Sequence, residues 1–204
     1  MDDKLDKEEK KILLELARKS LESAVKGESP PALEDFPLTA RLRQEGASFV
    51  TLTVHGNLRG CIGALEPYQS LAEDVREHVA AAALEDYRFP KVQEQELKAI
   101  EIEISRLTIP TPLEYGNADD LLEKIKPGID GVVLRDAFRR ATFLPQVWEK
   151  IPETADFLAN LCLKMGNPPD AWRTRHLNVM IYHVEEFSEK ILLPKIQGDR
   201  NGTS

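Results

Sequence analysis

Residues 47–63 read ASFVTLTVHGNLRGCIG and predict the β-hairpin around which the chain folds. Alternation with threonine indicates a strand with one apolar face, made by Val50, Leu52 and Val54. A two-residue turn at 56–57 would place Arg59 on that face. A three-residue turn at 55–57 keeps the face apolar, because it sets the strand's apolar residues opposite Ile62, Gly60 and Leu58. We therefore favour the three-residue turn.

This turn leaves a polar group on the other face of the hairpin, made of Thr51, Thr53, Arg59 and Cys61. Gly60 and Gly63 carry no side chains, so something else must fill the space beside them. A packed helix, an aromatic ring and a bound ligand all satisfy this requirement. The glycines alone do not choose between packing and ligand binding.

Arg59 and Cys61 are the residues of this stretch with chemical potential. Residues two apart on a strand lie roughly 7 Å apart, within reach of an arginine side chain. A neighbouring cation lowers the pKa of a thiol from about 8.5, and a guanidinium also binds carboxylates and phosphates. Cys61 is therefore a candidate nucleophile, and the alternative is a small buried residue. A base is missing locally, so it would come from one of the histidines, His55, His78, His176 or His183.

The remaining pattern predicts an α+β fold with antiparallel sheet, because hairpins occur without regular βαβ alternation. We expect helices over 5–26, 70–86, 117–125, 145–151 and 153–165, and further strands over 99–107, 131–135, 139–144 and 177–187. Residues 1–110 and 174–204 form the expected larger subdomain. Residues 111–173 form the smaller, inserted one. Cys162 lies on an apolar helical stripe and is assigned to its core.

Three further features have weaker functional readings. Glu101 and Glu103 share a strand face with Ser105, where two carboxylates can share a proton, although such a face is more often simply solvated. Arg88 ends a helix in the sequence Arg-Phe-Pro and could supply a second cation to the site. No spacing of cysteine and histidine matches a zinc site, so no metal ligands are assigned and no cofactor is identified.

Composition excludes several classes of protein. The 204 residues carry a net charge of −8 without a long run of Lys or Arg, which makes nucleic acid an unlikely partner. Two cysteines are too few for a disulfide framework, so we expect reduced thiols and a cytoplasmic location. The charged N-terminus is unlike a signal peptide, and no apolar run approaches the roughly 20 residues that cross a bilayer, so no membrane association is expected.

Several motifs together resemble the AMMECR domain family over nearly the whole chain: LRGCIG at 58–63, RFP at 88–90, IDGVVL at 129–134, TFLPQV at 142–147 and LCLKMG at 161–166. The resemblance implies two subdomains, each with an antiparallel sheet flanked by helices, and a cleft between them that LRGCIG faces. Microbial members of the family are called AmmeMemoRadiSam system protein A. That name implies an association with a Memo-like protein and a radical SAM protein, but no reaction.

We expect the chain to bind or transform a small anionic substrate at LRGCIG. In this reading Arg59 anchors the anion, Cys61 is the nucleophile, and the ligand is admitted or contacted by Gly60, Gly63, Thr51, Thr53 and Arg88. The first alternative is a non-catalytic adaptor that docks to a Memo-like or radical SAM partner. The second is a component of a nucleic-acid base modification system, which the acidic composition disfavours.

Overall fold

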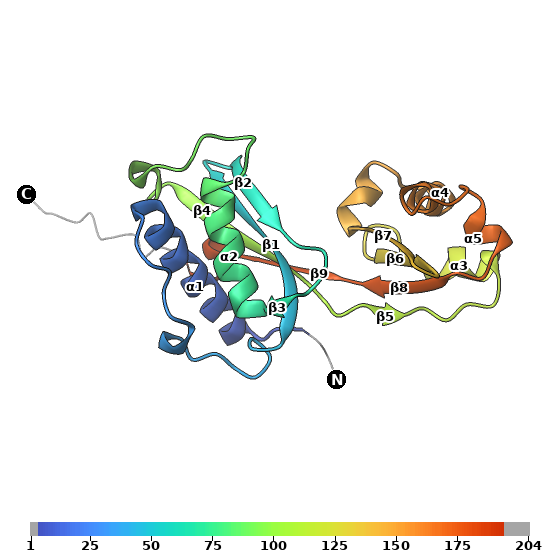
Figure 1. Cartoon of the computed structure of the whole chain (residues 1–204), viewed down its shortest axis with the longest axis horizontal. Helices are drawn as coiled ribbons and strands as arrows, with labels where there is room; N and C mark the ends of the chain where they lie inside the picture. Colours follow the sequence, from blue (N-terminus) through green and yellow to red (C-terminus); the bar gives the residue numbers. More distant parts are fainter. Residues whose placement is uncertain (1–3, 194–204) are drawn as a thin grey trace, which may run out of the picture. The chain divides into compact units, whose positions relative to one another are not determined.

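A computed structural model describes residues 4–193 of the chain. Over the described residues the chain forms two compact units: the larger contains residues 4–106 and 185–193, and the smaller contains residues 107–184. Helices accompany two antiparallel sheets, which confirms the predicted α+β class (Figure 1). Within residues 4–193, no helix combines the length and the apolar character needed to cross a membrane.

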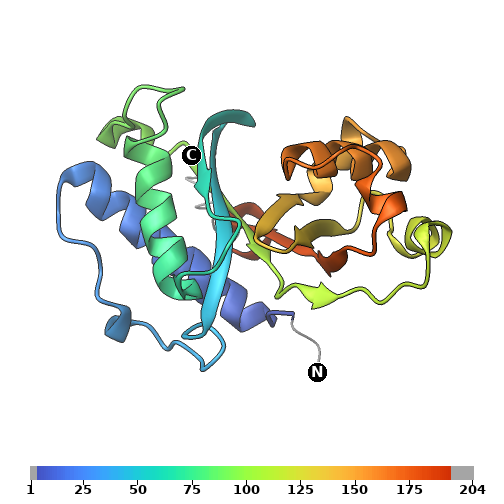
Figure 2. The ribbon, with the colours of Figure 1, turned by 45° about the vertical axis from the view of Figure 1, so that its right-hand side comes forward.

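The larger unit has a sheet with the strand order β2-β1-β4-β9, and a short strand, β3, also pairs with β1. The bounds of these strands are Glu45–Val54 (β1), Asn57–Gly63 (β2), Gln69–Ser70 (β3), Ile100–Leu107 (β4) and Val184–Ser188 (β9). Two long helices, α1 (Lys7–Lys26) and α2 (Leu71–Leu84), cover one face of the sheet (Figure 2). The short helices are η1 (Leu33–Asp35), η2 (Glu94–Glu96) and α6 (Glu189–Leu192).

The boundaries of α1 follow from its end residues. The Asp6 side chain accepts a hydrogen bond from the Glu9 backbone, and the Glu9 side chain accepts one from the Asp6 backbone, which forms a capping box. Gly27 ends the helix in the left-handed region, with a φ of 71°. The apolar stripe between these ends is buried against α2 and the sheet, as the spacing predicts, with Leu13, Leu16, Ala17 and Leu21 inaccessible to solvent.

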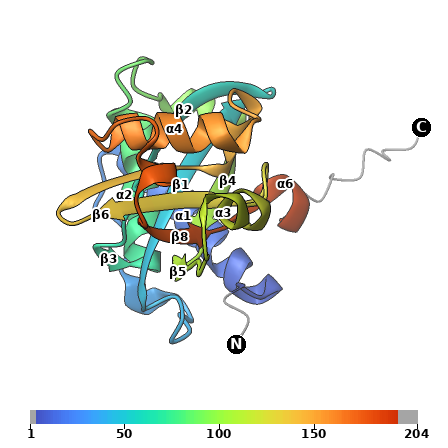
Figure 3. The same cartoon turned by 90° about the vertical axis from the view of Figure 1, so that its right-hand side faces the viewer.

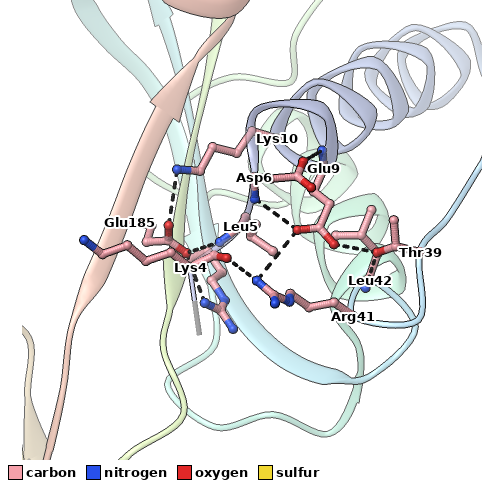
Figure 4. Close-up of polar contacts among 10 residues, drawn as sticks. Lys4, Leu5, Asp6, Glu9, Lys10, Thr39, Arg41, Leu42 and Glu185 are labelled. Carbon is pink, nitrogen blue, oxygen red and sulfur yellow. Dashed lines mark hydrogen bonds and ion pairs between the residues drawn. The ribbon is translucent and has the colours of Figure 1, made fainter. Parts of the chain in front are cut away.

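Two buried carboxylates fix the start of α1 within the larger unit (Figure 4). Glu9 also accepts a hydrogen bond from the Thr39 hydroxyl at 2.7 Å. Glu185, on β9, contacts Lys10 Nζ at 3.2 Å and Arg106 Nη1 at 3.0 Å, and it accepts a hydrogen bond from the backbone of Leu5. Through these contacts Glu185 connects α1 and β4 to β9. Removing one partner of a buried ion pair typically costs about 3–5 kcal/mol of stability.

The hairpin of β1 and β2 has the predicted register only in its inner half. Leu52 pairs with Gly60 and Val50 with Ile62, as expected. The turn, however, contains two residues, His55 and Gly56, both with positive φ, and a β-bulge between Leu52 and Thr53 restores the register. The extra residue is Arg59, which the pairing omits. The predicted three-residue turn is therefore wrong: the additional residue lies in the strand.

Because of this bulge, the outer half of β2 is shifted by one residue from the predicted pairing. Leu58 pairs with Thr53 instead of Val54, and its side chain is 45% exposed. A one-residue shift moves a side chain to the opposite face of a sheet. The predicted apolar contact between Leu58 and Val54 across the hairpin is thus replaced by an exposed leucine.

Gly60 sets the distance between β2 and α2. A Cβ atom at this position would lie 2.1 Å from the carbonyl oxygen of Ala82, in α2. Cβ atoms essentially never approach an oxygen so closely, so any side chain here would push the helix away from the strand.

The smaller unit has a sheet with the order β5-β8-β6-β7. Its strands are Thr111–Pro112 (β5), Gly131–Asp136 (β6), Arg139–Phe143 (β7) and Asn178–Tyr182 (β8), and its helices are α3 (Ala118–Lys124), η3 (Pro145–Glu149), α4 (Thr154–Lys164) and α5 (Ala171–Thr174). Figure 3 views this unit with α4 beside the sheet. The rings of Trp148 and Phe157 stack at 3.6 Å in its core, and Cys162 is fully buried there, as predicted.

The predicted last strand, 177–187, is wrong as a single element. It is two strands, β8 in the smaller sheet and β9 in the larger, and they are separated at His183. The backbone of His183 is bound on both sides by Thr108: its N–H donates to the Thr108 hydroxyl at 2.8 Å, and its carbonyl accepts from the Thr108 N–H at 2.9 Å. Residues 179–182 are all apolar and Val184 follows the histidine directly, so the sequence does not reveal the break.

We predict that Gly60→Ala destabilises the protein by about 2–3 kcal/mol, because the new methyl group meets the backbone of α2. Gly116→Ala is the matched control, since the nearest atom to its Cβ would be Asp120 Oδ2 at 3.8 Å. This control should change stability by less than about 0.5 kcal/mol. Urea unfolding followed by circular dichroism measures both values. Equal losses in the two variants would contradict close packing at Gly60.

Candidate functional site

Cys61 lies in the middle of β2 with its side chain partly exposed. It is paired directly with Thr51 of β1, and the Thr51 hydroxyl lies 3.4 Å from the sulfur. Both side chains therefore occupy the face opposite to Val50 and Leu52, which are buried in the core beneath the helices. We call this the open face of the hairpin.

Side chains from the segment after α2 bind both backbone polar groups of Cys61. Its N–H donates to Asp86 Oδ2 at 2.9 Å, and its carbonyl accepts from Arg88 Nη2 at 3.1 Å. Arg88 in turn donates to both carboxylate oxygens of Asp86, at 2.8 Å and 2.6 Å. β2 is the end strand of its sheet, so the Asp86–Arg88 pair occupies the position of a missing neighbouring strand.

The charge state of this pair follows from its contacts. Hydrogen bonds from the Arg88 guanidinium hold the pKa of the Asp86 carboxyl well below its usual range, and the Cys61 N–H adds to this effect, while burial opposes it. The same hydrogen bonds raise the pKa of Arg88. Asp86 is buried, whereas the Arg88 side chain is 45% exposed. The pair thus holds the strand on one side and presents part of a guanidinium to solvent on the other.

Arg59 has a different set of contacts from the one expected. Its Nε and Nη2 donate to the two carboxylate oxygens of Glu96 at 2.8 Å and 3.1 Å, and its Nη1 donates to the carbonyl of Pro90 at 2.8 Å. The hydrogen bonds from Arg59 to the carboxylate lower the pKa of Glu96. Among residues 4–193, no hydrogen bond joins Arg59 to Cys61. An anionic ligand at Arg59 would have to displace Glu96 from a bidentate ion pair.

The glycines of the motif are close-packing positions. Besides the contact of Gly60 with α2, a Cβ at Gly63 would lie 2.4 Å from the carbonyl oxygen of Ser48 and 2.5 Å from Cα of Phe49. Protein backbone therefore fills the space that was expected to admit a ligand. The structure favours the packing alternative for both glycines.

Acidic residues occupy the same sheet farther from the hairpin. Glu101 and Glu103 lie on β4, next to β1 in the sheet, and Glu103 is exposed while Ser105 is buried. Although the residue is exposed, partial desolvation of its carboxyl by surrounding protein atoms raises the pKa of Glu103, and the nearby carboxylates of Glu186 and Glu101 add to this effect. Over the described part of the chain, no group of three histidine, cysteine or acidic side chains is arranged to hold a metal ion.

The four histidines have separate surroundings. His55 is exposed in the hairpin turn, and the rest, His78, His176 and His183, contact Asp74, Tyr115 and Asp130, respectively. His183 has the surroundings most typical of a general base, since its Nε2 lies 3.0 Å from a carboxylate oxygen of the buried Asp130 while its own side chain is half exposed. Between residues 4 and 193, none of the four forms a hydrogen bond with Cys61. The general base therefore stays unassigned.

Asp86 and Glu96 are the site residues that sequence reasoning missed. They lie 25 and 37 residues from their partners in β2, so no local pattern connects them. A usable signal was nonetheless present: two arginines that adjoin a strand edge require carboxylates, and the segment between α2 and β4 supplies them.

Comparisons with known proteins agree with this architecture. The AMMECR1 family model matches residues 14–187. Protein MK0488 of Methanopyrus kandleri is 37% identical over 198 residues, which is 93% of each chain, and protein MJ0810 of Methanocaldococcus jannaschii is 34% identical over 189 residues, covering 89% of this chain and 90% of the relative. The crystal structure of the uncharacterized protein PH0010 from Pyrococcus horikoshii matches with a TM-score of 0.70 and 32% identity, covering 91% of this chain and 94% of that one.

We predict that the two thiols react at different rates in the folded protein. Cys61 is partly exposed, whereas Cys162 is fully buried and burial raises the pKa of its thiol. With a disulfide reagent at neutral pH, one thiol should react quickly, and Cys61→Ser should abolish this fast phase. Cys162→Ala should leave it intact, and unfolding in urea should expose both thiols. Equal rates for the folded wild type would contradict the assignment.

We also predict that Asp86→Asn destabilises the protein in a pH-dependent way. The folded-state pKa of Asp86 is lowered, so its ionised form stabilises the fold above the ordinary carboxyl pKa near 4, and this contribution is lost as the pH falls below that value. Unfolding free energies should differ from the wild type by about 2 kcal/mol at pH 7, and the difference should shrink toward pH 3.

The exposed Glu28, which has no side-chain partner in the described part of the chain, gives the control variant Glu28→Gln. This control should match the wild type at every pH. A constant difference for Asp86→Asn between pH 7 and pH 3 would show that the charge of Asp86 is not what holds β2.

Proposed function

The chain belongs to the AMMECR1 family, and we propose that it binds a small anionic molecule on the open face of its hairpin, beside Cys61. One observation carries this proposal: a partly exposed thiol is held at a fixed position, because both backbone groups of Cys61 are bound by the Asp86–Arg88 pair. Fixed placement of a reactive group is what ligand binding and catalysis both demand.

Arg88 is the cation best suited to hold the anion. Its Nε and Nη2 are bound to Asp86 and Cys61, while Nη1 has no hydrogen bond among the described residues. Half of the side chain is exposed, so Nη1 can bind a carboxylate or phosphate oxygen. In this proposal Arg88 takes the anchoring role first expected of Arg59, whose guanidinium is already paired with Glu96.

Cys61 is the candidate nucleophile in this arrangement, and Thr51 and Thr53 line the face beside it. The Thr51 hydroxyl can donate a hydrogen bond to the sulfur, so negative charge on the sulfur has a donor 3.4 Å away. Two unpaired cysteines are in keeping with a reducing location such as the cytoplasm.

A second candidate function is favoured by Tyr87. This residue lies between Asp86 and Arg88, and its side chain is 96% exposed although both neighbours are firmly bound. An aromatic side chain displayed from a fixed backbone is typical of protein interfaces. The family resemblance names the partners for such an adaptor, a Memo-like protein or a radical SAM protein.

Ligand binding is tested with a panel of small carboxylates and phosphate esters, detected by backbone NMR shifts. We predict that at least one compound shifts the Cys61 and Thr51 resonances, and that Arg88→Gln weakens its binding at least tenfold. Tyr87→Ala is the neighbouring control and should bind normally. The opposite pattern, in which Arg88→Gln binds equally well or no compound shifts these resonances, would contradict the proposal. The adaptor would be supported instead if Tyr87→Ala no longer bound a purified Memo-like or radical SAM protein while Cys61→Ser bound it normally.

A further inference from the structure

The turn between β6 and β7 displays an aromatic side chain that the fold does not use. Asp136 pairs with Arg139, so the turn consists of Ala137 and Phe138, and it projects from the smaller sheet (Figure 3). Ala137 has a φ of 51°, a left-handed conformation that costs a residue with a Cβ about 1 kcal/mol. Asn-Gly is the preferred pair for a two-residue turn of this kind. Instead this chain places Phe138 in full contact with solvent.

Beside this turn, a buried amide and the carboxylate that it binds hold one arginine each. Asn167 is only 5% exposed; its side-chain N–H donates to Asp136 Oδ2 at 2.8 Å, and its side-chain oxygen accepts from Arg139 Nη1 at 2.7 Å. Arg139 Nη1 also donates to the carbonyl of Gly166. Arg175 Nη1 binds the same Asp136 oxygen at 3.0 Å. Each guanidinium is thus held through one nitrogen.

The other nitrogens of these guanidiniums are available for a ligand. Within residues 4–193, Nε and Nη2 of Arg139 and of Arg175 form no hydrogen bond with the protein, and both side chains are exposed. A cavity of about 320 Å³ lies among Asp136, Phe138, Arg139, Asn167, Pro168 and Arg175. Two cations and one carboxylate leave it with a net positive charge.

We propose that this tip, made of Phe138, Arg139 and Arg175, is a docking site for an acidic segment of another protein. A carboxylate side chain of the segment binds the free edge of a guanidinium in bidentate fashion. A large apolar side chain beside it packs on Phe138 and Pro168, which buries the exposed ring. The positive charge of the cavity thus matches the carboxylate of the segment, and the apolar margin of the cavity matches its large apolar side chain.

The charges at the tip favour a protein segment over a nucleic acid as the partner. A nucleic-acid strand carries one phosphate per nucleotide and is held by a row of cations, whereas the tip offers two guanidiniums beside a carboxylate. The net charge of −8 on the whole chain also repels an extended polyanion. A protein segment with one or two acidic residues meets neither obstacle.

The test is selection from a library of displayed random 12-residue peptides on the full chain, with counter-selection on the double variant Phe138→Ser, Arg175→Gln. Enriched peptides should carry Asp or Glu close to a large apolar residue. Synthetic copies, measured by fluorescence anisotropy, should bind the wild type at least tenfold more tightly than either single variant, and higher salt should weaken the binding.

Matched controls come from the larger unit. Ile191→Ser removes another highly exposed apolar side chain, and Arg43→Gln removes another exposed arginine, so both should bind the peptides like the wild type. Circular dichroism checks that each variant is folded. The proposal is overturned if no acidic consensus is enriched, if the peptides bind the tip variants equally well, or if labelled oligothymidylate binds the tip in their place. It does not depend on the anion proposed at Cys61.

Discussion

The contact between α2 and β2 at Gly60 is the constraint on which the candidate site depends. Because this position has no side chain, the carbonyl of Ala82 lies against the strand backbone. The helix ends two residues before Asp86, so the same contact brings the Asp86 carboxylate within reach of the strand edge. The position of Cys61 is therefore set from behind by packing and from the side by hydrogen bonds. A bulkier residue at 60 would disturb both.

Arginines in this chain differ in how far their charge is already balanced. Arg59 is matched to a carboxylate in bidentate fashion and also binds a carbonyl, so its role is to attach the bulge to the segment before β4. Arg88 is paired as well, yet its side chain is 45% exposed and its Nη1 has no hydrogen bond among the described residues. Arg139 and Arg175 share a neighbourhood with a single carboxylate. The positive charge that an arginine can offer to a ligand therefore depends on how many carboxylates lie near it. The number of arginines in a sequence motif does not reveal this.

The parts of the fold that follow from the sequence are those in which burial is periodic. The stripes of α1 and α4, the buried Cys162 and the inner pairing of Val50 and Leu52 all follow from the spacing of apolar residues. Sequence patterns fail to predict the fold where a single residue changes the geometry. The bulge at Arg59 leaves the alternation of Leu58, Gly60 and Ile62 in the sequence unchanged, and the break at His183 lies within a stretch rich in apolar residues. The carboxylate partners of β2 come from another part of the chain, which a local pattern cannot specify.

The side chains on the outer edge of β2 also bear on the solubility of the protein. An end strand offers N–H and carbonyl groups to any extended chain that approaches it, and such additions are the first step of sheet-like aggregation. At Cys61 both groups are occupied by a buried carboxylate and a guanidinium. The segment that binds the backbone of Cys61 thus also hinders polymerisation through this edge, because an approaching strand finds both polar groups already paired.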